Sequence, residues 1–171
     1  MNNSIQQSNI LLRLYRFFPL VLLFGSVLNE IDFNNLGLKY FSFNFSYILI
    51  FYFSLKKSDN LGYVSIFIAG LFNDVVTGIP MGISSLVFLL LCGATAYLRN
   101  ITLRPSLMKD WIFFLMTILT VNSISFLILT FFFDYEINFF SLAMNIVFTF
   151  LFYLVFSYVF NFLERTVIGK V

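Results

Sequence analysis

The sequence predicts an all-α, polytopic membrane protein with six transmembrane helices and no soluble domain. Its composition, its long apolar runs and the placement of its charges support this prediction. Of the 171 residues, 60% are hydrophobic and 11% are charged, and the mean hydropathy is +0.94. A soluble domain carries about 25% charged residues, because its surface must be hydrated. We therefore expect a single membrane domain over residues 1–171.

Six apolar runs give the expected helices. A helix needs about 20 mainly apolar residues to cross the hydrocarbon core. The runs that approach or exceed this length are residues 15–31, 40–55, 61–77, 82–98, 111–133 and 138–162. The second, third and fourth are short, at about 24–26 Å for a rise of 1.5 Å per residue. These three need a thinner bilayer or a few flanking residues to span it.

The first run resembles the start of a signal peptide, because Arg13 and Arg16 precede it. No small-x-small cleavage site follows, and the run ends at Asn29 and Glu30. We therefore expect an uncleaved first helix.

Charge placement predicts that both termini lie in the cytoplasm. In that orientation nine of the ten Lys and Arg residues fall in cytoplasmic segments, and only Lys39 falls outside. The outer segments carry Glu30, Asp32, Asp134 and Glu136 instead. This asymmetry is the one that the positive-inside rule describes.

The residue inventory argues against most site chemistry. The chain has no His, which is the commonest general base and zinc ligand, and its one Cys, Cys92, lies in an apolar run. We expect no catalytic residues, no metal and no cofactor. The net charge is only +2, and the basic residues are spread along one membrane face. We interpret them as topology determinants that touch anionic lipid, and not as a nucleic-acid surface.

The turn between the third and fourth runs combines an acid with glycines and a proline. Asp74 is the one acid inside an expected span, where an ionised carboxylate needs protein, water or a partner around it. Gly70, Asp74 and Gly78 follow one helical stripe, which favours close approach of another helix backbone. Pro80 is expected to end the third helix, and Gly78 and Gly82 to give the turn its conformational freedom.

For Asp74 we favour a helix-hairpin clasp, in which the carboxylate accepts hydrogen bonds from local backbone or a neighbouring helix. A partner contact, and an ion, proton or ligand site, are the alternatives. A proton or ion relay usually needs a second titratable group along its path, and no other expected span contains one.

Polar residues also occur within the last two runs. We expect Asn122, Ser125 and Asn145 to make interhelical hydrogen bonds, with a polar ligand cavity at the bundle centre as the alternative. Small residues in the third and fourth runs are expected to form close-packing surfaces. These are Ser65, Ala69, Gly70, Gly93, Ala94 and Ala96.

The turn resembles the motif of the rod shape-determining protein MreD family, which reads G-L-x-x-D, three residues, and then G-x-P-x-G before an apolar helix. The matching positions are Gly70, Leu71, Asp74, Gly78, Pro80 and Gly82. Met81 stands where family members commonly have Leu. The chain length, the six-run layout, the short loops and the basic connection at 99–109 also resemble the family.

The resemblance implies a non-enzymatic scaffold in the bacterial inner membrane, a subunit of the elongasome that maintains rod shape. Such proteins bind MreC, a bitopic membrane protein. With it they help to couple cytoplasmic MreB filaments to lateral peptidoglycan synthesis, and so to a RodA-type glycosyltransferase and a penicillin-binding transpeptidase.

The family is also similar in architecture to the substrate-binding subunits of energy-coupling-factor transporters. A small-molecule-binding membrane subunit of such a transporter is therefore the alternative. It predicts a polar pocket near Asp74 and Asn122, and a volume filled by Phe and Leu would count against it. A membrane-embedded enzyme acting on lipid is disfavoured, because all Lys residues lie outside the runs.

Overall fold

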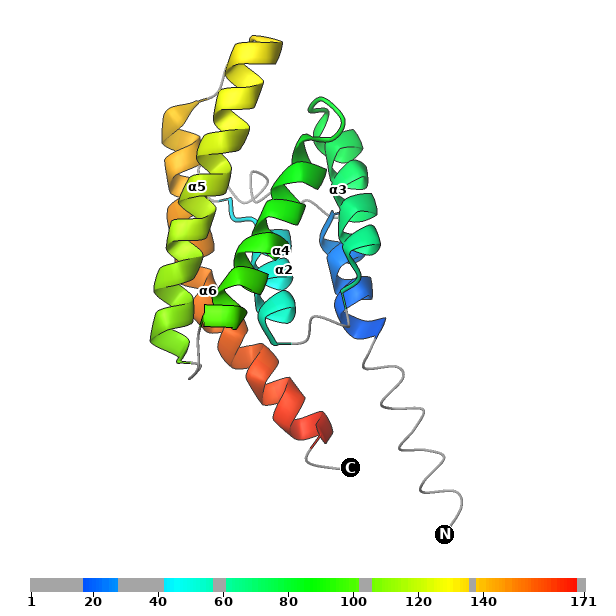
Figure 1. The fold of residues 1–171 in the computed structure, drawn as a ribbon, viewed down its shortest axis with the longest axis vertical. Helices are drawn as coiled ribbons and strands as arrows, with labels where there is room; N and C mark the ends of the chain where they lie inside the picture. Colours follow the sequence, from blue (N-terminus) through cyan, green and yellow to red (C-terminus); the bar gives the residue numbers. More distant parts are fainter. Residues whose placement is uncertain (1–16, 28–41, 57–60, 102–105, 136–137, 169–171) are drawn as a thin grey trace.

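The computed structural model describes residues 17–27, 42–56, 61–101, 106–135 and 138–168. Within these ranges the chain is all-α, and successive helices alternate in direction along one bundle (Figure 1). The helices are an N-terminal helix Phe17–Val27, α2 Phe45–Lys56, α3 Tyr63–Thr77, α4 Ile83–Ile101, α5 Leu107–Phe133 and α6 Phe139–Ile168.

Three of these helices, α4, α5 and α6, are long and apolar enough to cross a membrane, by length and composition. The N-terminal helix, α2 and α3 are apolar but shorter. The predicted all-α class with several apolar helices is confirmed. The ends of the first expected run, and residues 40 and 41 of the second, lie outside the described residues.

The long helices extend beyond the apolar runs. The sequence placed their ends at residues 98, 111 and 162, whereas α4 continues to Ile101, α5 begins at Leu107 and α6 reaches Ile168. Basic residues do not end a helix, because a long aliphatic stem carries the charge away from the apolar surface. In the last turn of a helix, as at Arg165 in α6, a basic residue also interacts favourably with the helix dipole.

Helix α2 is the central helix of the bundle. All seven residues from Ile48 to Ser54 are buried. It packs against α4 and α6, and the Ser46 hydroxyl lies 2.8 Å from that of Ser26 in the N-terminal helix. A helix that is apolar on every side belongs in the interior, and this one fills that position.

Aromatic side chains fill the interface between α2, α5 and α6. Phe51, Phe114 and Tyr153 are each no more than 1% exposed. The ring centroid of Phe51 lies 4.9 Å from that of Phe114 and 5.6 Å from that of Tyr153. The rings of Phe114 and Tyr153 stack at 4.5 Å. Each such pair contributes about 0.5–1.5 kcal/mol beyond the burial of its area.

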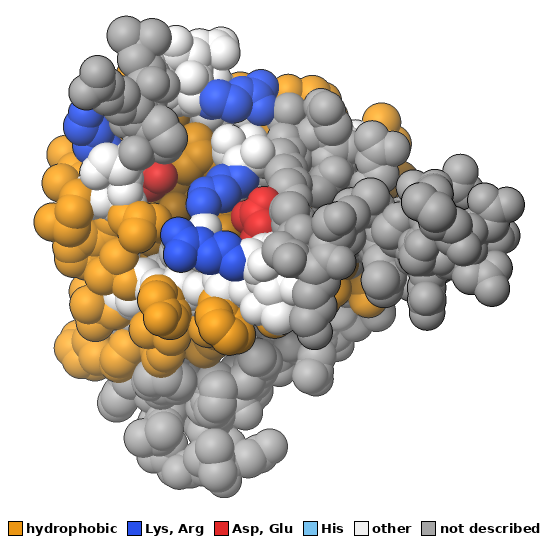
Figure 2. Space-filling model, turned by 90° about the horizontal axis from the view of Figure 1, so that it is seen from below, with side chains coloured by type: hydrophobic (Ala, Val, Ile, Leu, Met, Phe, Trp, Pro, Cys, Tyr) orange, Lys and Arg blue, Asp and Glu red, His pale blue; other side chains and the backbone are white. Residues whose placement is uncertain are grey.

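The two ends of the bundle differ in charge. Lys56, Arg99 and Arg165 lie in the last turns of α2, α4 and α6, and Lys109 lies in the first turn of α5. Because the helices alternate in direction, these four residues meet at one end, hereafter the basic end (Figure 1). Figure 2 shows Lys and Arg side chains gathered on this face. The turn between α3 and α4 lies at the opposite end, hereafter the hairpin end.

Candidate functional site

The carboxylate of Asp74 joins α3 to the beginning of α4. Its Oδ2 accepts a hydrogen bond from the backbone N–H of Gly82 at 2.6 Å, and its Oδ1 accepts one from the N–H of Ser84 at 2.8 Å. The Asp74 side chain is completely buried. Each carboxylate oxygen therefore has a backbone partner where α4 begins, eight residues later in the chain at Gly82 and ten residues later at Ser84.

This contact acts as a helix N-cap supplied from another helix. The first hydrogen bond of α4 runs from the Leu86 N–H to the Gly82 carbonyl at 2.9 Å, which places Gly82 at the N-cap position. Gly82 has no side chain to bind the free N–H groups that begin every helix. Asp74 binds two of them, and its negative charge lies at the positive end of the α4 dipole.

Two glycines give the turn its shape. Gly78 follows the last residue of α3 and adopts a left-handed conformation with φ of 69°, and Gly82 has φ of 103°. Side chains disfavour both conformations. Gly78, and not Pro80, therefore ends α3, because the chain leaves the helix two residues before the proline. Gly78 is also no packing site, since a Cβ atom there would have no neighbour within 4 Å.

Gly70 provides the close approach of the two helices. A Cβ atom built on Gly70 would lie 2.4 Å from the Cα atom of Ser85 on α4. The Ser85 hydroxyl donates to the carbonyl of Phe67, one turn earlier on α3, at 2.9 Å. The amide of Asn73 donates to the Ser84 hydroxyl at 2.9 Å. The α3–α4 hairpin is thus held by hydrogen bonds on both sides of Asp74.

The remaining motif residues have no polar role in this turn. Leu71 and Pro80 are half-buried, one in the last part of α3 and the other between Gly78 and Gly82. The small residues of α4 differ from Gly70. Gly93 is exposed, and a Cβ atom there would meet nothing within 4 Å. The expectation that Gly93 forms a close-packing surface is wrong, because Gly93 opens onto a groove between α4 and α5 and does not touch the neighbouring helix.

Three polar residues were expected to make interhelical hydrogen bonds. Within the described residues, only one of them, Asn145, bonds residues outside its own helix. Asn145 on α6 accepts from the Asn44 amide at 3.0 Å and donates to the Ser42 hydroxyl at 3.0 Å. The Asn122 amide donates instead to the Ile118 carbonyl of its own helix, at 2.8 Å. Ser125 is half-buried on α5 and has no hydrogen bond to another helix within the described residues.

A polar recess lies beside these residues, toward the hairpin end. Its volume is about 320 Å³. Its lining residues come from the segment that leads into α2, from the connection between α5 and α6, and from both of those helices. They are Ser42, Asn44, Asn122, Tyr135, Asn138, Ser141, Leu142 and Asn145. Asn122 and Asn145 share this recess, whereas Asp74 is not part of its lining.

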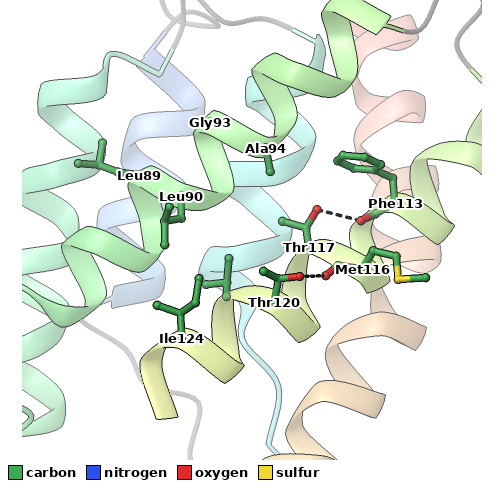
Figure 3. Close-up of a pocket in the computed structure, with 10 residues that line it drawn as sticks. Leu89, Leu90, Gly93, Ala94, Phe113, Met116, Thr117, Thr120 and Ile124 are labelled. Atoms are coloured by element: carbon green, nitrogen blue, oxygen red, sulfur yellow. Dashed lines mark hydrogen bonds between the residues drawn. The ribbon is translucent and has the colours of Figure 1, made fainter. Parts of the chain in front are cut away.

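An apolar groove of about 400 Å³ runs between α4 and α5 (Figure 3). It is lined by Leu89, Leu90, Gly93, Ala94, Phe113, Met116, Thr117, Thr120, Val121 and Ile124. The hydroxyls of its two threonines donate to Phe113 and Met116, four residues earlier on α5, at 2.8 and 2.9 Å. Their polar hydrogens are thus used within α5, so the groove surface is suited to hydrocarbon.

A second buried acid lies at the basic end. Asp110 falls one residue before the fifth expected run, yet it is in the first turn of α5 and only 6% exposed. Its electrostatic partner is Lys56 on α2, whose ammonium donates to the Asn161 side chain of α6. Asp110 lies outside the expected run 111–133 but inside α5, because the helix begins four residues before that run. The sequence does contain a signal for this position, because an Asp immediately before an apolar run is typical of the first turn of a helix.

The two acids do not form one path across the bundle. Asp74 binds the beginning of α4, whereas Asp110 follows the end of α4 and lies at its other end. The 19 residues of α4 correspond to about 28 Å at 1.5 Å per residue. Within the described residues, no three His, Cys, Asp or Glu side chains are grouped so that they could hold a metal ion.

These observations define the class as an all-α protein with several membrane-compatible helices and a clasped helical hairpin. Comparison with protein-family models, with curated proteins and with solved structures gave no match.

Proposed function

We propose that this protein is a six-span, non-enzymatic scaffold of the bacterial inner membrane, similar to the MreD family. In this proposal it binds an MreC-like bitopic protein within the bilayer. Through that partner it helps to couple MreB filaments to lateral peptidoglycan synthesis. The family assignment rests on the sequence resemblance described above.

The hydrogen bonds of the Asp74 carboxylate are the observation that supports a structural role. Both of its carboxylate oxygens accept backbone hydrogen bonds, and the side chain is 0% exposed. A group that is to bind substrate or move protons needs a free atom and access. Gly70, Gly78 and Gly82 serve the same hairpin through close approach and positive φ. The motif thus has a folding function, which suits a scaffold.

The charge distribution supports an orientation with the basic end in the cytoplasm. Lys56, Arg99, Lys109 and Arg165 lie at that end, where the positive-inside rule places them. The short helices α2 and α3 cover about 18 and 22 Å at 1.5 Å per residue. In a six-span protein they cross the bilayer only with flanking residues or local thinning.

Co-purification with the MreC-like protein of the same organism tests this proposal. Tagged wild-type protein in lipid nanodiscs should capture that partner. A partner whose transmembrane helix is replaced by an unrelated apolar helix of equal length should be lost, because the contact is made in the bilayer. Failure to capture the native partner, or equal capture of the exchanged one, would contradict the scaffold proposal.

The polar recess favours one alternative, a substrate-binding membrane subunit of an energy-coupling-factor-type transporter. Asn122 lines that recess, as the alternative predicts, but Asp74 has no free oxygen and does not line it. The transporter reading predicts capture of cytoplasmic ATPase subunits in place of a bitopic protein. The same co-purification therefore distinguishes the two.

A further inference from the structure

The polar recess at the hairpin end is built from uncharged hydrogen-bonding groups. Seven of its eight lining residues carry a side-chain amide or hydroxyl, and none of the eight is charged. It lies where α2 begins. Because α2 has 12 residues and α5 has 27, α5 is longer than α2 by about 22 Å at 1.5 Å per residue. The shorter helix leaves part of the polar surface of α5 and α6 uncovered.

One wall of the recess is fixed by its own hydrogen bonds. Asn145 joins Asn44 and Ser42, as described above, and the backbone N–H of Asn44 donates to the Thr149 hydroxyl at 2.9 Å. Asn138 caps α6, since its Oδ1 accepts from the Phe140 N–H at 3.0 Å. These bonds hold the side chains in place, so the recess has a defined shape without a ligand.

Several polar atoms of the recess retain hydrogen-bonding capacity. The Asn122 Oδ1, the Asn138 Nδ2 and the hydroxyl of Ser141 have no partner among the described residues. Both donors and acceptors are thus available in the recess. Asn122 and Asn145 lie within expected membrane spans, where polar groups that face hydrocarbon are costly. A polar occupant would remove that cost.

The lining also selects the chemistry of the occupant. An anionic group would find no Lys or Arg in the recess, and Asp134 precedes Tyr135 at its edge. A cation would find no carboxylate in the lining. Amides and hydroxyls, which donate and accept at once, match the hydroxyl groups of a saccharide. Tyr135, 44% exposed, also lines the recess, and it is an aromatic residue of the kind that can pack against the apolar side of a sugar.

We infer that this recess binds a neutral saccharide, either free or as the headgroup of a glycolipid. Its volume of about 320 Å³ lies at the lower end of small-molecule sites, which span about 300–1,000 Å³. Saccharide binding would go beyond the scaffold role and does not rest on it.

Binding to the full-length protein in phosphatidylcholine nanodiscs tests the inference, because sugar-headed detergents are then absent. The probes are glucose, by equilibrium dialysis, and glucosyl diacylglycerol, by native mass spectrometry. Diacylglycerol and phosphatidylglycerol are the matched lipids without a sugar. Asn122→Leu removes an acceptor, and Asn138→Asp keeps the α6 cap while it replaces a donor by a charge. Thr120→Val, on the apolar groove of the same helix, is the control variant.

We expect saturable binding of glucose or of glucosyl diacylglycerol, weakened at least about tenfold in both Asn variants and less than about twofold in Thr120→Val. Binding of free glucose would identify a soluble saccharide as sufficient, whereas binding of the glycolipid alone would identify a headgroup. Absence of binding of both probes to the wild type would overturn the inference. Equal binding of phosphatidylglycerol, or wild-type affinity in both Asn variants with unchanged thermal unfolding, would do the same.

Discussion

Replacing Asp74 by Ala removes the side chain that caps the beginning of α4. Both oxygens of this buried carboxylate accept backbone N–H bonds, from Gly82 and Ser84. The substitution leaves these two N–H groups without partners, and it leaves a cavity between α3 and α4. We expect a large loss of stability from this single change.

The magnitude follows from the two bonds. A hydrogen bond to a charged group contributes about 1.5–3 kcal/mol, so two of them give about 3–6 kcal/mol for Asp74→Ala. The amide of Asp74→Asn can accept one bond, but its NH₂ group meets the second N–H donor. We therefore expect a loss of about 2–3 kcal/mol for Asp74→Asn. Small domains have only about 5–15 kcal/mol in total.

Unfolding by sodium dodecyl sulfate in mixed micelles measures this loss. The fluorescence of Trp111, the single Trp, reports on its stacking with Phe150 at 4.4 Å, and far-ultraviolet circular dichroism reports on the helices. Coincident transitions would justify a two-state free energy. Asp134→Asn is the control, because Asp134 is exposed and its φ of 49° suits Asn. A loss below about 1 kcal/mol for Asp74→Ala, or one equal to the control, would refute the clasp.

Three further predictions test the remaining structure. Gly70→Ala should lower the unfolding free energy by about 1–3 kcal/mol, because its Cβ would meet Ser85, whereas Gly93→Ala should not lower it; equal effects would disprove the close approach. Asn145→Leu should cost about 0.6–2 kcal/mol in the same unfolding assay, and Asn122→Leu less, because of these two only Asn145 bonds residues outside its own helix. A periplasmic reporter enzyme should be inactive when fused after residue 57 and active near residue 136, and the reverse pattern would invert the orientation.

The positions of the helices and the turn follow closely from the sequence. Apolar runs fix where helices form, because a backbone in lipid must satisfy its own hydrogen bonds. The glycines at 78 and 82 and the proline between them fix where the hairpin turns. The ends of α4, α5 and α6 are less predictable, because Arg99, Lys109 and Arg165 continue a helix after its apolar run has ended.

The choice of the central helix follows only from the tertiary structure. In a soluble helix the apolar stripe identifies the buried face. Here lipid accepts the same residues as the protein interior, so Phe51 of α2 is 0% exposed while Phe131 of α5 is 78% exposed. Both lie in runs of similar composition. Their difference is decided by which helices pack together.

The same limit applies to the site. The sequence alone indicates that Asp74 needs a partner, because a carboxylate in an apolar run cannot remain unsatisfied. Only the fold shows that the partner is the N-terminus of α4. The sequence predicts close packing at both Gly70 and Gly93, yet Gly70 lies against Ser85 and Gly93 faces open space. Asn122 and Asn145 likewise diverge, because a side-chain hydrogen bond depends on the neighbouring helix as well as on its own.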